Sequence, residues 1–182
     1  MKSLHAPVRL AVLLAAIALP ASLWGQVVCQ ITGPAGSCTT SATTAITVPT
    51  ILRLTIGSAT TPFGSITQAD YDLTRKDIAG PSVVVKANQP WRVQLSSAAI
   101  NWSAVNTDPL NPARTNKPLA DLLWAPTLGG SFTAVTGTPI QIGAGGRTGG
   151  TTIPLAFRSL WSYTLDTPGN YSIGVTFTLI SP

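Results

Sequence analysis

The sequence predicts an all-β protein, an antiparallel immunoglobulin-like β-sandwich of about eight or nine short strands. Short runs of alternating or β-branched apolar residues recur along the chain, and turns rich in Gly and Pro separate them. No stretch keeps a helical period over several turns. Many short strands joined by such turns are typical of antiparallel sandwiches and barrels.

The first predicted strand places Leu52, Leu54 and Ile56 on one face. The β-branched run 82–87 and the alternating run 91–97 follow, separated by Asn-Gln-Pro, and together they predict a hairpin. The remaining predicted strands are residues 132–135, 139–142, 152–157, 160–165 and 171–179. Between them we expect a loop with one short helix at residues 57–81 and a Pro-rich loop at residues 106–118. One helical turn is expected at residues 118–123, and a Gly-rich hairpin loop at residues 143–151. Before the last strand, Pro168 and Gly169 predict a type II turn with Gly169 in the left-handed position.

Residues 1–25 are typical of an export signal peptide, with Lys2 and Arg9 before an apolar stretch and small residues after it. That stretch is shorter than the roughly 20 apolar residues that cross a bilayer, and nothing later is apolar for long enough. We therefore expect cleavage after Gly25, with Ala21 as the alternative, and a single domain over residues 26–182. The mature protein is expected in the periplasm, on the cell surface or outside the cell, with no membrane span.

Charged residues make up only 9% of the chain, against about 25% in a typical soluble domain. The Lys and Arg residues that follow the signal are scattered, without the basic run or aromatic-basic platform that nucleic-acid binding requires. We expect no nucleic-acid partner. The low charge also leaves little electrostatic repulsion between copies of the chain.

Cys29 and Cys38 are the only cysteines. In an exported chain such a pair predicts a disulfide, here closing a short loop. A metal pair is the alternative, but it needs further ligands, and the only histidine, His5, is removed with the signal. We expect no metal and no cofactor.

Catalytic residue types are scarce, because residues 26–182 contain neither Glu nor His. A Ser-His-Asp triad, a Cys-His pair and a His-based metal site are thereby excluded from the mature chain. Asp70 and Asp72 leave open a paired-carboxylate hydrolase, and with Asp77 a calcium loop. A solvated turn is the simpler interpretation, and we expect no enzymatic activity.

Four tryptophans, Trp91, Trp102, Trp124 and Trp161, raise the possibility of sugar binding, because exposed indole rings stack on sugars. Trp91, Trp124 and Trp161 lie in apolar, strand-like surroundings, which predicts positions in the core. Trp102 is left undecided by its context.

The clearest strand is near the C-terminus, where apolar side chains alternate with small or polar ones. Its apolar row consists of Tyr171, Ile173, Val175, Phe177 and Leu179. The stretch "TPGNYSIGVTFTLIS", through Gly169, Tyr171, Val175, Phe177 and Leu179, resembles the C-terminal strand of bacterial pilin-type and spore-coat-protein-U-like secreted sandwiches. The resemblance implies a sandwich that lacks a strand and accepts one from a neighbouring subunit by β-augmentation.

Two departures from those families stand in the sequence. The chain has Ile180, Ser181 and Pro182 where the families carry an aromatic residue. The families also need a donor segment, and the only candidates here are "QVVCQITG", which is tethered by Cys29, and "TTAITVPTILRLTI", which looks like an ordinary strand. The expected function is a secreted, non-catalytic structural surface protein. It is expected to assemble with copies of itself or related subunits by pairing of the strand that carries the row from Tyr171 to Leu179. The alternative is a monomeric extracellular module that binds a carbohydrate or another surface ligand.

Overall fold

The computed structural model describes residues 29–182, and the predicted signal at residues 1–25 lies outside them. The described residues belong to two units, with the boundary between Thr47 and Val48. In the first unit Cys29 and Cys38 form a disulfide, with their Cα atoms 5.8 Å apart, which confirms the predicted pairing. Residues 29–51 are exposed, and apart from a bend at residues 33–35 they have no regular structure.

The helices and strands of the described residues lie in the second unit. They are β1 (Leu52–Ile56), α1 (Gln68–Asp72), β2 (Arg75–Ala79), β3 (Val83–Ala87), β4 (Trp91–Ser96), β5 (Ser103–Asn106), a 3-10 helix (Leu119–Asp121), β6 (Leu122–Ala125), β7 (Thr133–Ala134), β8 (Ile140–Gly145), β9 (Thr148–Ile153), β10 (Ala156–Leu160), β11 (Gly169–Ser172) and β12 (Thr176–Ile180). No helix among these residues is long and apolar enough to span a membrane.

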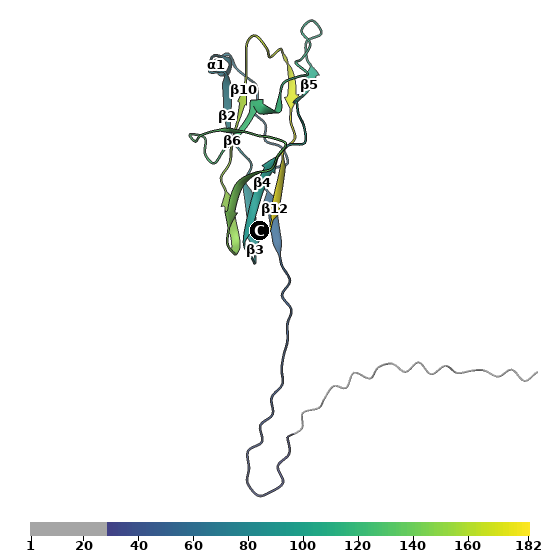
Figure 1. The fold of residues 1–182 in the computed structure, drawn as a ribbon, viewed down its shortest axis with the longest axis vertical. Helices are drawn as coiled ribbons and strands as arrows, with labels where there is room; N and C mark the ends of the chain where they lie inside the picture. The colour runs from purple at the N-terminus through teal and green to yellow at the C-terminus, as the bar shows by residue number, and fades with distance from the viewer. Residues whose placement is uncertain (1–28) are drawn as a thin grey trace, which may run out of the picture. The chain divides into compact units, whose positions relative to one another are not determined.

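The strands form antiparallel sheets, which confirms the all-β, sandwich-like class. The sheet orders are β1-β3-β9, β12-β4-β8, β2-β10-β6-β7 and β11-β5. In Figure 1, β3, β4 and β12 lie toward one end of this unit, and α1, β2, β10 and β5 lie toward the other. The twelve strands exceed the predicted number, partly because strands such as β2, rich in charged residues, carry no apolar alternation to reveal them.

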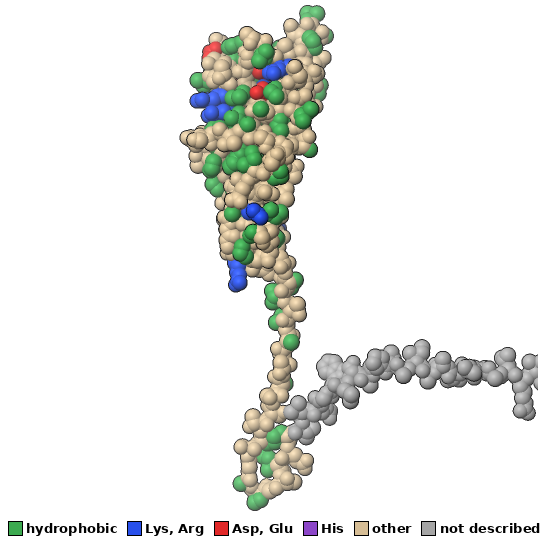
Figure 2. All heavy atoms as spheres, viewed as in Figure 1, with side chains coloured by type: hydrophobic (Ala, Val, Ile, Leu, Met, Phe, Trp, Pro, Cys, Tyr) green, Lys and Arg blue, Asp and Glu red, His purple; other side chains and the backbone are tan. Residues whose placement is uncertain are grey.

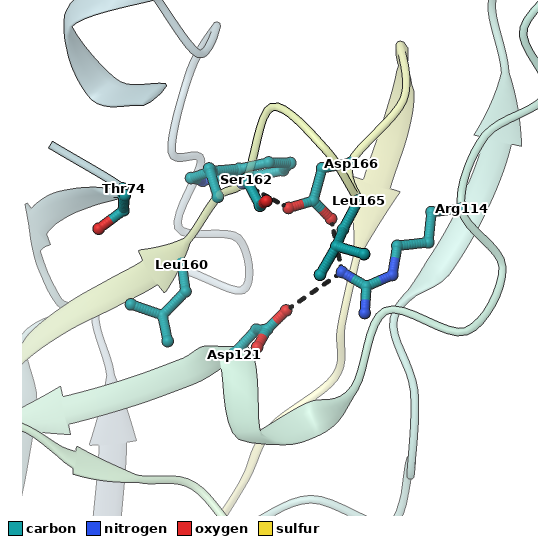
Figure 3. Close-up of a pocket in the computed structure, with 8 residues that line it drawn as sticks. Thr74, Arg114, Asp121, Leu160, Ser162, Leu165 and Asp166 are labelled. Atoms are coloured by element: carbon teal, nitrogen blue, oxygen red, sulfur yellow. Dashed lines mark hydrogen bonds and ion pairs between the residues drawn. The ribbon is translucent and has the colours of Figure 1, made fainter. Parts of the chain in front are cut away.

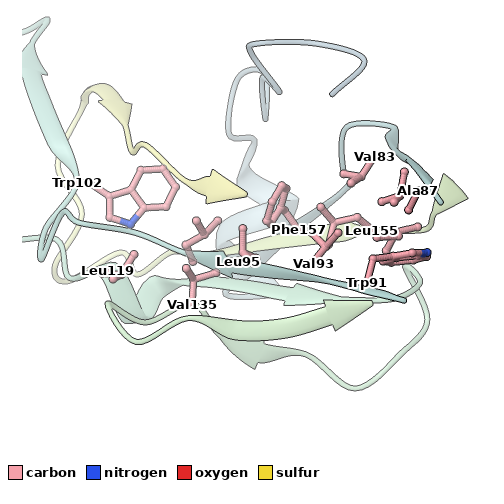
Figure 4. Close-up of a cluster of buried hydrophobic side chains, with 13 residues drawn as sticks. Val83, Ala87, Trp91, Val93, Leu95, Trp102, Leu119, Val135, Leu155 and Phe157 are labelled. Atoms are coloured by element: carbon pink, nitrogen blue, oxygen red, sulfur yellow. The ribbon is translucent and has the colours of Figure 1, made fainter. Parts of the chain in front are cut away.

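The core is built from strands that bury every second side chain. Val83 and Val85 of β3, and Val93 and Leu95 of β4, are all 0% exposed. Figure 4 shows these strands' apolar side chains gathered with Trp91, Leu155 and Phe157 into one cluster. Removal of this apolar surface from water is the main stabilising contribution to the fold.

The hairpin predicted for residues 82–87 and 91–97 is wrong, since β3 and β4 belong to different sheets. β3 already has β1 on one side and β9 on the other, and β4 has β12 and β8. The chain therefore crosses from one sheet to the other at the Asn-Gln-Pro turn. A pattern of alternation shows that two strands exist, but it does not show which strands pair.

The predicted strand at residues 171–179 is divided into two. β11 pairs with β5, and β12 pairs with β4, while residues 173–175 lie between them outside any ladder. The chain thus leaves one sheet and joins another. Its alternation of half-buried and exposed side chains nevertheless continues through the gap.

Two expectations about glycines are corrected by the structure. Residues 143–151 are mostly strand, because Gly143 and Gly145 let the chain pack closely: an added Cβ would lie 2.8 Å from Ile153 and from Trp91, respectively. Gly169 is not left-handed, and among the described glycines only Gly64 has a positive φ, of 70°. The type II turn predicted at Gly169 is therefore wrong.

Candidate functional site: an open groove along β11 and β12

An open groove of about 1130 Å³ runs beside the segment that contains β11 and β12. Residues 58–66, which follow β1, form one wall, and residues 167–175 form the other. The indole rings of Trp102 and Trp161 and the ring of Phe157 contribute to the lining. An extended chain rises about 3.3 Å per residue. Walls of nine residues each therefore offer room for a strand of several residues.

The apolar row predicted for assembly lies along this groove. Tyr171, Ile173, Val175 and Phe177 line it, and Leu179 follows on the same face of β12. These side chains pack against the core but remain only half-buried, whereas the core side chains of the paired strand β4 are fully buried. The groove therefore leaves one face of the core incompletely covered.

Two strand edges near the groove have no partner among residues 29–182. β1 pairs only with β3, and β12 pairs only with β4, so each stands at the edge of its sheet. The two strands approach each other, as Figure 1 shows, but no ladder joins them. An unpaired edge presents free N–H and C=O groups to any segment that approaches it.

The segment beside the groove is fixed by a few specific contacts. The Tyr171 hydroxyl donates to the carbonyl oxygen of Thr167 at 2.7 Å and accepts from the backbone N–H of Arg114 at 2.9 Å. Gly169 is required for close approach, because a Cβ at this position would lie 2.6 Å from the Cβ of Ala113. The wall is therefore held in place without an occupant.

The groove lining carries no charged side chain. Its ionisable groups include Tyr71, whose pKa is raised by burial and, to a lesser degree, by the nearby Asp166 and Tyr171. Tyr71 stays protonated and donates a hydrogen bond to the carbonyl oxygen of Asp166 at 3.3 Å. On the face seen in Figure 2, charged side chains are likewise few and scattered. A neutral, largely apolar segment would match this lining without the cost of burying charge.

The chain before β1 offers a neutral segment with apolar side chains at Ile46 and Val48 among Thr and Ser residues. Residues 29–51 include no charged residue, and Ile46 and Val48 are 89% and 72% exposed. Thr47 separates them, so an extended backbone would present both apolar side chains on one face. Of the two donor segments considered above, the second is partly an ordinary strand, since its residues 52–56 form β1.

The aspartates considered for catalysis or calcium have structural contacts. Asp70 closes a capping box with Thr67 at the start of α1 and bonds Lys76 at 3.1 Å. Its backbone hydrogen bond with Thr67 is the main cause that lowers the pKa of Asp70. Asp72 accepts from the Tyr163 hydroxyl at 3.0 Å, and Asp77 accepts two bonds from Arg158. Within residues 29–182 no three His, Cys, Asp or Glu side chains gather as a metal site.

None of the four tryptophans among residues 29–182 is exposed. Trp91, Trp102 and Trp161 are at most 7% exposed, and Trp124 is half-buried. The undecided Trp102 is thus a core residue, with the ammonium of Lys117 5.9 Å from the centroid of its ring.

The sequence pattern does not predict the groove wall at residues 58–66, because this segment lies in an expected loop and shows no alternation of apolar and polar residues. Only Phe63 and Ile66, among polar neighbours, indicate an apolar surface there.

No protein-family model matches the chain, and no curated protein is significantly similar to it.

Proposed function

We propose that the protein is an exported, non-catalytic structural subunit that assembles with copies of itself by β-strand pairing. The single observation that carries this proposal is the neutral groove beside β11 and β12, with a half-buried apolar row along it and unpaired edges on β1 and β12. The disulfide between Cys29 and Cys38 supports export, because such bonds persist in oxidising compartments.

The occupant we propose is residues 39–48 of a second copy. This segment is exposed, lacks regular structure and carries no charge. Its Ile46 and Val48 would enter the groove from one face of an added strand, while the backbone would pair with a free edge. The added strand would cover the inward row from Tyr171 to Phe177.

The hydrogen bonds at the start of the second unit favour a second copy over the chain's own segment. The Asn88 side chain donates to the carbonyl oxygen of Pro49 at 2.7 Å and accepts from the N–H of Ile51 at 2.8 Å. The Asn88 N–H also donates to the carbonyl oxygen of Ile51 at 3.2 Å. These bonds extend the β1 side of the ladder beyond Leu52. A hairpin that returned the preceding segment along β1 would have to break them.

The experiment is a comparison of oligomer size by sedimentation velocity over a range of protein concentrations. The wild type is expected to form concentration-dependent oligomers. Ile46→Asp should remain monomeric, because a carboxylate would have to enter the neutral groove. Thr47→Asp is the matched control: its side chain points to the other face of the strand, so assembly should persist.

A mixing experiment separates loss of pairing from loss of folding. Ile173→Asp should block the groove and leave residues 39–48 able to pair. Ile46→Asp should block pairing by residues 39–48 and leave the groove open. Each variant alone is expected to be monomeric, while their mixture should form a dimer. A wild type that stays monomeric at every concentration would instead support the alternative of a monomeric binding module. Equal effects of Ile46→Asp and Thr47→Asp would also contradict the proposal.

A further inference from the structure

A second concave site lies beside the groove and shares only Trp161 with it. It is a pocket of about 290 Å³, and Figure 3 shows Thr74, Arg114, Asp121, Leu165 and Asp166 arranged around it. We propose that this pocket binds a neutral sugar in its pyranose form. The proposal does not depend on assembly through the groove.

The charged groups at this pocket form a balanced network. The Arg114 guanidinium lies 3.0 Å from Asp166 Oδ1 and 3.9 Å from Asp121 Oδ2. Behind them Lys117 is 0% exposed, and its Nζ donates to Asp121, to Asp166 and to the carbonyl oxygen of Leu160, at 3.0, 3.2 and 2.6 Å. Two positive and two negative charges are thus held in fixed positions, and their sum is zero.

This balance selects the chemical class of the ligand. An anion that approached Arg114 would also face the carboxylates of Asp121 and Asp166, and a cation that approached Asp121 would face Arg114. A neutral polyol meets neither repulsion. Its hydroxyl groups can donate to a carboxylate and accept from a guanidinium at the same time.

The pocket has hydrogen-bonding capacity left for such a ligand. Among the hydrogen bonds of residues 29–182, Asp121 uses only Oδ2, and Arg114 uses only Nε and Nη1 of its side chain. Asp121 Oδ1 and Arg114 Nη2 therefore have no hydrogen-bond partner among these residues, and both side chains line the pocket. Neighbouring hydroxyl groups of a pyranose ring suit such a donor and acceptor pair.

The apolar lining suits the C–H face of the same ring. Leu160 and Leu165 line the pocket, and Leu165 is 57% exposed although it is a large apolar side chain. Trp161, which is 7% exposed, also lines the pocket. Apolar side chains with a few polar groups are the usual composition of a small-molecule site.

The backbone at the rim of the pocket is strained. Thr74 has a φ of 55°, in the left-handed region that a β-branched residue rarely adopts. Its N–H donates to the carbonyl oxygen of Tyr71 at 2.9 Å, and its carbonyl oxygen accepts from the N–H of Trp161 at 3.0 Å. Such strain persists where the surrounding structure enforces it, and it gathers at ligand-binding sites.

The test is saturation-transfer NMR on the full-length purified protein with D-glucose, D-galactose, D-mannose and N-acetyl-D-glucosamine. D-glucuronate and D-glucosamine serve as charged probes. At least one neutral sugar is expected to receive saturation through its ring C–H protons. Ser162→Leu should abolish the signal, since the larger side chain would fill the pocket while leaving the ion network in place. Thr164→Val, two residues away and outside the lining, is the control that should retain it.

Asp121→Asn provides a second test, since it keeps the size of the side chain and removes the charge of the acceptor. The affinity for the neutral sugar should fall about tenfold, and circular dichroism should verify that the variant is folded. Three results would overturn the proposal: no neutral sugar binds, only a charged probe binds, or binding persists in a folded Ser162→Leu variant. If Asp121→Asn fails to fold, the comparison of Ser162→Leu with Thr164→Val still decides the outcome.

Discussion

The Ser97 hydroxyl donates a hydrogen bond of 2.7 Å to the carbonyl oxygen of Gly174. Ser97 follows β4 and is 2% exposed, and Gly174 lies in the gap between β11 and β12. The bond therefore ties the wall of the groove to the buried end of a core strand. It takes the place of a ladder bond where the chain changes from one sheet to another.

Ser97→Ala should lower the free energy of unfolding by about 1–2 kcal/mol, because the N–H of Ala99 also loses its 3.2 Å bond to the same oxygen. Hydrogen exchange of residues 173–175 should become faster. Ser96→Ala, at the half-exposed neighbouring position, is the control for both measurements. Unchanged exchange in the gap would show that the bond does not hold this wall.

Phe177→Ala should destabilise the monomer by about 2–3 kcal/mol, less than the roughly 3–5 kcal/mol typical of a fully buried Phe. The reason is that Phe177 lines the open groove and is only half-buried. Thr178→Ala, on the exposed face of the same strand, should be nearly neutral. Chemical denaturation followed by tryptophan fluorescence gives both values, and equal values would place Phe177 outside the core.

Gly169→Ala should cost about 1–3 kcal/mol, because the new methyl group would meet Ala113 and the carbonyl oxygen of Val105 at 2.6 and 3.1 Å. Gly146→Ala is the matched control, since a Cβ there has no atom within 4 Å. Thermal unfolding compares the two variants directly. A Gly169→Ala protein as stable as Gly146→Ala would mean that the wall can move away from residues 105–113.

Lys86→Glu should stabilise the protein by about 0.2–1 kcal/mol. Arg53 and Lys86 lie directly opposite each other on β1 and β3, and both side chains are exposed, so the wild type places two positive charges side by side. The gain should shrink at high salt. It should also vanish in an Arg53→Ala background, and a gain that survives in that background would need another cause.

Asp70→Asn should lower stability at neutral pH, and the difference from the wild type should disappear in acid. Since the pKa of Asp70 is lowered in the folded state, chiefly by its hydrogen bond with the backbone of Thr67, its ionised form favours folding. This contribution is present above the ordinary aspartate pKa, near 4, and is lost as the pH falls through the lowered value. Urea titrations at several pH values measure it, and a constant difference down to low pH would contradict it.

The sequence alone was sufficient for the class of fold and for the inward rows of its clearly alternating strands. The strand predicted at residues 160–165 is wrong, since β10 ends at Leu160 and a turn follows. Alternation in β1, β4 and the run from Tyr171 to Leu179 reports a local property, since successive side chains of an extended chain point to opposite faces. The disulfide was likewise predictable from two nearby cysteines. Each of these conclusions depends on residues close together in the chain.

Only the tertiary structure decided how those strands pair and where the site lies. β3 and β4 looked like a hairpin but occupy different sheets, and the run at residues 171–179 is shared between β5 and β4. The groove requires residues 58–66 and 167–175 to face each other, and the smaller pocket requires Thr74, Asp121 and Leu165 to meet. Pairing depends on which edges remain free once all strands have packed, and this is a property of distant segments that no local pattern records.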